Sequence, residues 1–155
     1  MTAKARLGWL TIILLILPIL VCAQNRPNRG MVNWSSDTPY VRMYNPQTVQ
    51  TVTVTVQKVE IFTPEKGMSM GIHLTANLND ELLNVHLGPA WFIKNQELQI
   101  IEGDELEITG SMITFEGSEA LIAKTVKLKE DTLTLRDDTG RPVWAGWKRG
   151  RRMMN

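Results

Sequence analysis

Cysteine is nearly absent from this sequence, because Cys22 is the only one in 155 residues. A single cysteine excludes an internal disulfide and the Cys-x-x-Cys-His motif that attaches haem. Histidine is almost as scarce, with two residues. The sequence also has no recognisable Ser-His-Asp set, phosphate-binding glycine loop or glycosidase-like pair of carboxylates. We therefore expect no enzyme activity and no bound cofactor.

An excess of one charge is absent as well, since the formal net charge is +1 at pH 7. Lys4 and Arg6 belong to a first segment that has no acidic residue, so the rest of the chain is close to neutral. Proteins that bind nucleic acid through its phosphates need a large basic surface. We therefore do not expect nucleic acid as a partner. The composition, with 43% hydrophobic and 21% charged residues, is that of one packed globular domain.

The most apolar stretch of the chain covers residues 10–21, near the N-terminus. Lys4 and Arg6 precede it and Val21-Cys22-Ala23 follows it, which gives the basic, apolar and small-residue parts of a secretory signal peptide. We expect residues 1–23 to be cleaved off before Gln24 and the protein to be exported to the periplasm. The only cysteine then leaves with the signal peptide.

Two alternatives to cleavage stay open. An uncleaved inner-membrane anchor would run through residues 8–23, although a spanning helix needs about 20 apolar residues and Pro18 interrupts this one. Lipidation of Cys22 is the other alternative, and it is disfavoured because Val21 occupies a position where lipoprotein signals have a small residue.

The rest of the chain divides by composition into three segments. Residues 24–47 are rich in Asn, Arg, Pro and Ser and predict a polar tether, whose later half Trp34, Tyr40 and Tyr44 would pin to the domain. Residues 48–147 form the predicted domain. Residues 148–155 form a basic tail, which has the charge to contact anionic lipid headgroups.

The run from Val49 to Ile61 predicts a long first strand, because valines alternate with threonines along it. The apolar positions are even up to Val56 and odd from Val59 onward. A change of parity requires one extra residue, so we predict a β-bulge near Gln57-Lys58 that bends the strand.

Asn79-Asp80 predicts a two-residue hairpin turn between the second and third strands. The second strand begins at Met68, with Met68, Met70, Ile72, Leu74 and Ala76 on its apolar face, and the third strand has Leu83, Val85 and Leu87. The turn then sets Leu74 opposite Val85 inside the sheet and His73 opposite His86 on its outer face.

The remaining elements complete an all-β domain. Gly88-Pro89 ends the third strand, and residues 90–96 predict a short helical cap. Leu106 to Met112 and Ala120 to Leu128 predict the fourth and fifth strands, and residues 132–147 an added hairpin around residues 137–140. Three strands, a cap and two strands are the order of a five-stranded OB-like barrel. Another small barrel or an open meander of five or six strands is the alternative.

Several segments resemble the MamS/MamX family of magnetosome proteins and related exported bacterial domains. The matching residues are Tyr44-Asn45-Pro46, Val85-His86-Leu87-Gly88-Pro89-Ala90-Trp91-Phe92, Gly103-Asp104, Thr109-Gly110-Ser111, Leu135-Arg136-Asp137 and Gly140-Arg141-Pro142-Val143-Trp144. The resemblance names a domain rather than an activity. Some relatives carry haem-attachment motifs, which this sequence lacks, so haem-based electron transfer does not carry over.

His73 and His86 are the candidate metal ligands, because directly opposed residues on two strands lie close enough for two imidazoles to share an ion. Zinc sites use three or four protein ligands, and the spacing fixes no third one here. Met68 and Met70 offer thioethers that suit Cu(I), but their parity predicts that both point into the core. Half-exposed polar histidines on a sheet face are the simpler interpretation.

Exposed aromatic rings would give a binding surface, with Arg141 beside them. The candidates are Trp91, Phe92, Trp144 and Trp147. The competing interpretation is that these rings plug the barrel ends and pack the added hairpin. From the sequence we expect a non-enzymatic, exported binding or adaptor module with an envelope protein as partner. The alternative is a periplasmic protein that binds Cu or Zn through His73 and His86.

Overall fold

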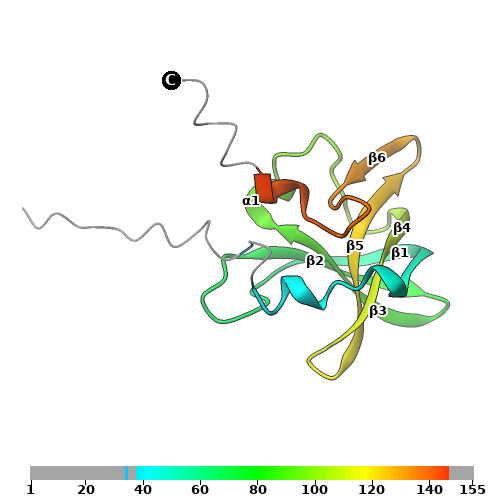
Figure 1. Ribbon diagram of the computed structural model, residues 1–155. Helices are drawn as coiled ribbons and strands as arrows, with labels where there is room; N and C mark the ends of the chain where they lie inside the picture. Colours follow the sequence, from blue (N-terminus) through cyan, green and yellow to red (C-terminus); the bar gives the residue numbers. More distant parts are fainter. Residues whose placement is uncertain (1–33, 35–37, 147–155) are drawn as a thin grey trace, which may run out of the picture.

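The domain is a closed five-stranded β-barrel with one further strand, in a computed structural model that describes residue 34 and residues 38–146 (Figure 1). The elements are η1 (Val41–Met43), η2 (Pro46–Thr48), β1 (Val49–Phe62), β2 (Gly71–Leu78), β3 (Glu81–Pro89), α1 (Ala90–Ile93), β4 (Glu105–Phe115), β5 (Ser118–Leu128), β6 (Asp131–Thr134) and η3 (Val143–Gly146). The strand order is β3-β2-β1-β4-β5-β6, and a parallel pairing of β3 with β5 closes the barrel. The predicted OB-like architecture is confirmed.

Strand β1 serves both halves of the barrel because it bends. Its first half pairs with β4 and its second half with β2, and the register with β2 shifts between Val56 and Lys58. This shift is the predicted β-bulge. Val54 and Val56 are buried before the bulge, whereas Val59 and Ile61 after it are 36% and 53% exposed.

The hairpin of β2 and β3 has the predicted register, with Leu74 opposite Val85 and His73 opposite His86. Asn79 and Asp80 have φ values of 54° and 68°, as a two-residue turn between twisted strands requires. The second strand begins at Gly71 rather than at the predicted Met68. A second irregularity lies between Ile72 and His73, where β3 has one extra residue.

The C-terminal part differs from the predicted hairpin of two strands. Only β6 is a strand, and it pairs with β5 across a turn at Lys129 and Glu130. After β6, a single bridge between Arg136 and Pro142 closes a loop, and the short helix η3 follows. Proline cannot donate a ladder hydrogen bond, which explains why pairing does not continue.

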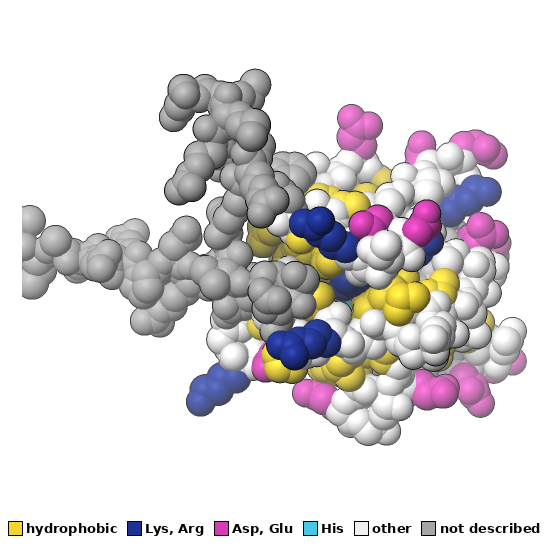
Figure 2. Space-filling view, in the orientation of Figure 1, with side chains coloured by type: hydrophobic (Ala, Val, Ile, Leu, Met, Phe, Trp, Pro, Cys, Tyr) yellow, Lys and Arg dark blue, Asp and Glu magenta, His cyan; other side chains and the backbone are white. Residues whose placement is uncertain are grey.

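The core fills the barrel and extends under the N-terminal segment. Trp34 and Tyr40, from outside the strands, are buried in the same cluster as the barrel residues. Hydrophobic side chains still reach the surface in places (Figure 2), and the large exposed ones are Val59, Ile61, Met70, Leu82, Ile101 and Val143. Within the residues described, no helix is long and apolar enough to cross a membrane. The predicted signal peptide lies outside these residues.

Candidate binding site

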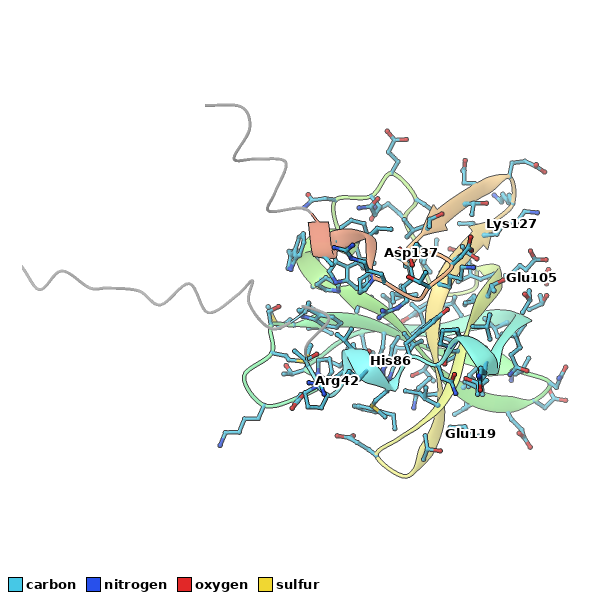
Figure 3. All side chains as sticks on the ribbon, viewed as in Figure 1. Arg42, His86, Glu105, Glu119, Lys127 and Asp137 are labelled. Atoms are coloured by element: carbon cyan, nitrogen blue, oxygen red, sulfur yellow. The ribbon has the colours of Figure 1, made fainter. Side chains whose placement is uncertain are left out.

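His86 is buried, which corrects the expectation that both histidines are half-exposed on an outer face. Its side chain is only 2% exposed, because the N-terminal segment that carries Tyr40 and Arg42 lies over β3 (Figure 3). Its Nδ1 atom lies 2.9 Å from the hydroxyl of Tyr40, in a buried hydrogen bond. Burial lowers the pKa of His86 from 6.5 to about 4, and the neighbouring His73 contributes in the same direction. The ring is therefore neutral at neutral pH.

Aromatic rings enclose His86 on several sides. Phe62 and Phe115 contact it with ring centroids at 4.6 and 4.8 Å, and the Tyr40 ring stacks at 5.8 Å. Burial also raises the pKa of the Tyr40 hydroxyl above its ordinary value, so Tyr40 stays protonated. The sequence placed Tyr40 on the domain but did not indicate His86 as its partner. These rings form an apolar cluster that attaches the N-terminal segment to the barrel.

His73 lies beside this cluster and is partly exposed. Its ring centroid is 5.9 Å from that of His86, and its Nε2 atom is 3.4 Å from a carboxylate oxygen of Glu60. No group of three or more His, Cys, Asp or Glu side chains in the described part of the chain is arranged to hold a metal ion. The paired-histidine metal site stays a prediction.

The two candidate methionines are separated by their surroundings. Met68 is buried, as expected, but Met70 is 57% exposed, so the prediction that both point inward is wrong for Met70. The reason is that residues 63–70 form a loop and alternation starts only at Gly71. Within the described residues the structure does not bring either thioether together with the two histidines.

The predicted aromatic surface is mostly interior. Phe92 and Trp144 are buried, lie 5.3 Å apart between ring centroids, and pack the end of β3, where Trp144 covers Gly88. Trp91 is half-buried and meets Phe92 edge to face. Trp147 and the basic tail lie outside the described residues. Phe92 and Trp144 therefore contribute to the core instead of an exposed platform.

Arg136 is a buried cation, although the sequence did not indicate that this side chain lies in the core. Its guanidinium lies 5.1 Å from the centre of the Tyr44 ring and 5.5 Å from that of Trp144, and it donates to the carbonyl oxygen of Gly140. Burial lowers its pKa to about 10. The sequence signal that could have indicated this burial is the position of Arg136 directly after Leu133 and Leu135, which alternate inward. Arg136 therefore joins the C-terminal loop to the aromatic core.

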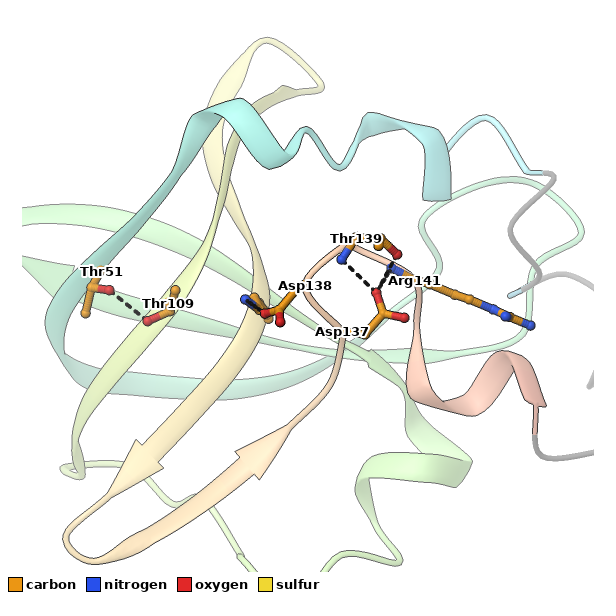
Figure 4. A network of polar contacts seen from close by, with 7 residues as sticks. Thr51, Thr109, Asp137, Asp138, Thr139 and Arg141 are labelled. Carbon is orange, nitrogen blue, oxygen red and sulfur yellow. Dashed lines mark hydrogen bonds and ion pairs between the residues drawn. The ribbon is translucent and has the colours of Figure 1, made fainter.

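Arg141, by contrast, is exposed on the same loop (Figure 4). Asp137 shapes this loop, since one of its oxygens accepts hydrogen bonds from the backbone N–H groups of Thr139 and Arg141 and from the Thr139 hydroxyl. These bonds lower the pKa of Asp137. Lys124 reaches the loop through an ion pair with Asp138. These bonds hold the backbone of the loop that carries Arg141.

The barrel end beside α1 is open in a way that the sequence did not predict. A hollow of about 190 Å³ lies there, which we call the apolar hollow. It is lined by Val59, Ile72, Leu87, Ile93, Lys94, Leu98, Gln99 and Ile100. Helix α1 has only four residues, so it covers part of the barrel end and leaves Val59 36% exposed at the mouth. The sequence signal that could have indicated the hollow is the alternation of apolar Leu98 and Ile100 with polar residues.

Comparisons with known proteins name a family for this chain. A search of curated proteins finds no match. Among solved structures, the chain is similar to the Stn1–Ten1 complex of S. pombe, with 14% identity, a TM-score of 0.39, and coverage of 79% of this chain and 91% of that one. The family model described as the MamS/MamX magnetosome protein family matches residues 48–133. This chain therefore belongs to the MamS/MamX magnetosome protein family.

Proposed function

We propose that this protein is an exported, non-enzymatic binding module that engages another protein of the cell envelope through the apolar hollow. The observation that carries the proposal is the hollow itself. It is a half-open apolar site at the end of an otherwise closed barrel. The predicted signal peptide supports the location of the partner.

The hollow suits one large apolar side chain of the partner. Six of its eight lining residues are aliphatic, and Lys94 and Gln99 are its polar members. An enclosed cavity of about 150 Å³ lined by Leu, Ile and Phe side chains binds a molecule as large as benzene. The hollow is of similar size, and Lys94 favours an acidic residue next to the inserted side chain.

Crosslinked pull-down from envelope extracts tests the proposal when it is combined with a substitution at the mouth. We expect Val59→Glu to lose the specific partner that the wild type captures, because it places a charge in the hollow. Val143→Glu is the matched control, since Val143 is 40% exposed but lies in η3 and does not line the hollow. Capture of the same partner by Val59→Glu, or a measured turnover of some substrate, would contradict the proposal.

Metal binding is the second candidate, and the cross-strand pairing of His73 and His86 is the observation that favours it. Binding through His86 Nδ1 would require the hydrogen bond to Tyr40 to break. The hypothesis expects near-stoichiometric uptake of Cu or Zn by the purified protein. Equal uptake by the wild type and by the His73→Ala/His86→Ala variant would remove this site.

A further inference from the structure

Strand β6 forms one edge of the sheet, and its outer side faces away from β5. The strand order ends at β6, whereas β3, at the other end of the order, is joined to β5 by the parallel pairing. Among the described residues no further strand pairs with the outer edge of β6, so another strand can add there.

The register of β5 and β6 determines which backbone groups point outward. Leu128 and Asp131 flank the two-residue turn, so they form the hydrogen-bonded pair nearest to it. Thr132 and Thr134 pair with Lys127 and Thr125 at the alternate, non-hydrogen-bonded positions. The N–H and C=O groups of Thr132 and Thr134 consequently point away from β5, in the spacing that an added strand would meet.

A slot runs along this edge and has a volume of about 490 Å³. Its walls are Asp131, Thr132 and Leu133 of β6 and, opposite them, residues 95–98 of the segment that follows α1. A β-strand fills roughly 160 Å³ per residue, from its rise, strand spacing and sheet spacing, so the slot has room for about three residues. This length is close to that of the four-residue strand β6.

The wall opposite β6 is held by its own hydrogen bonds. The Asn95 side chain donates to the carbonyl of Trp91, and the Gln96 side chain donates to that of Phe92. Gln99 in turn donates to the carbonyl of Gln96. These bonds fix the wall to α1, so the slot is preformed and less ordering is needed when a ligand enters it.

The charges of the slot indicate the kind of segment that fits it. Glu97 and Asp131 are its ionisable members, and no lysine or arginine of the described residues lines it. Acidic side chains are also frequent on the side of the molecule where β6 lies (Figures 1 and 2). We propose that the slot binds an extended segment of a partner protein, which carries at least one Lys or Arg and adds to β6 as a further strand.

The same charges disfavour a second copy of this chain as the occupant. Pairing of β6 with the β6 of another copy would bring two sets of Glu97 and Asp131 together at one edge, and like charges that meet across strands are destabilising. A basic segment instead forms backbone hydrogen bonds for affinity and ion pairs for specificity. The slot adjoins the apolar hollow at Leu98, which lines both, but this inference does not depend on the hollow.

Selection from a display library of randomised seven-residue peptides tests the inference. The bait is the protein purified from the envelope of cells that express it, and the affinity of a selected peptide is then measured by calorimetry. We expect selected peptides to be rich in β-branched residues with Lys or Arg. Thr132→Pro should weaken binding at least tenfold, because it removes an outward N–H while sparing the bonds to β5. Thr132→Val keeps this N–H and should bind within about twofold of the wild type.

Two further comparisons make the test independent of the folding of the proline variant. N-methylation of the peptide at the residue opposite Thr132 should reproduce the tenfold loss on the unaltered protein. Glu97→Gln/Asp131→Asn should bind basic peptides severalfold more weakly, whereas Glu81→Gln/Glu119→Gln, which removes the same charge from exposed positions outside the slot, should not. Figure 3 shows Glu119 at the hairpin of β4 and β5.

Four outcomes would overturn the inference. The first is that the wild type selects no peptide. The second is that Thr132→Pro and the N-methylated peptide bind as tightly as their unmodified counterparts. The third is a dimer in sedimentation that Thr132→Pro converts to monomer, which would assign the edge to a second copy. Loss of peptide binding by Val59→Glu alone would place the site in the hollow and not at β6.

Discussion

Two regions of the barrel differ in how far they are covered. One is the outer face of β2 and β3, and the other is the barrel end beside α1. On the outer face, Tyr40 from the N-terminal segment covers His86 and bonds to it, with Phe62 and Phe115 beside them. At the barrel end, the four residues of α1 leave aliphatic side chains in an open hollow. The first region contains both candidate histidines, yet His86 is buried there and His73 is only partly exposed. The second contains none of them and is accessible.

This difference shows that a polar residue on a strand is not by itself a sign of a binding surface. His86 satisfies its hydrogen bond inside the protein, as buried polar groups generally do. Apolar side chains that stay accessible are the more informative feature, because burying them against a partner is favourable. This contrast is why the barrel end, and not the histidine face, is the proposed recognition surface.

The largest expected loss of stability on the closed face is that caused by replacing Tyr40. We expect Tyr40→Ala to lower the free energy of unfolding by about 3–5 kcal/mol, because it removes a buried ring from the cluster around His86. Denaturant melts measure this loss. Met70→Ala is the control, since Met70 is exposed. A loss below about 0.5 kcal/mol for Tyr40→Ala would mean that the N-terminal segment is not part of the core.

Acid should weaken the closed face through His86. The folded pKa of about 4 lies below the ordinary 6.5, so between these values the unfolded chain binds a proton that the folded protein excludes. The contribution of His86 to the free energy of unfolding is fully present above pH 6.5, and it falls by about 3 kcal/mol as the pH drops to 4. Denaturant melts between pH 7 and 5 measure mainly the effect of the histidine, because most carboxylates titrate below this range. The titratable neighbours of His86 are His73 and Glu60. His86→Gln should flatten the slope, and an unchanged slope would assign it to other groups.

A finer test removes only the hydrogen bond. Tyr40→Phe keeps the ring and leaves His86 Nδ1 without its partner, so we expect a loss of about 1–2 kcal/mol. The matched variant is Tyr44→Phe, because the Tyr44 hydroxyl makes no hydrogen bond within the described part of the chain. Equal losses in the two variants would contradict a specific role for the Tyr40 hydroxyl.

The smallest effect belongs to the open end. Val59→Thr should change the free energy of unfolding by less than about 0.5 kcal/mol, because this side chain is 36% exposed. The same melts check it. A loss above about 1.5 kcal/mol would show that the hollow is part of the packed core and would weaken the proposed function.

Most of the barrel was predictable because its causes are local. The parity change after Val56 identified the bulge, and Asn79-Asp80 fixed the register that sets His73 opposite His86. The sequence did not predict features that depend on contacts between distant segments. Tyr40, which is 46 positions away in the sequence, covers His86. Tyr44 and Trp144 pack against Arg136 and bury it. Alternation indicates two faces of a strand, but it does not indicate what covers the second face.

The contact between Trp34 and Trp144 joins positions 110 residues apart. The Trp144 indole donates to the carbonyl oxygen of Trp34, and the two rings meet edge to face with centroids 6.3 Å apart. The first and last described portions of the domain therefore share one attachment point. A short linker between them would allow circular permutation with new ends in the β4–β5 hairpin turn, at Glu116 and Gly117.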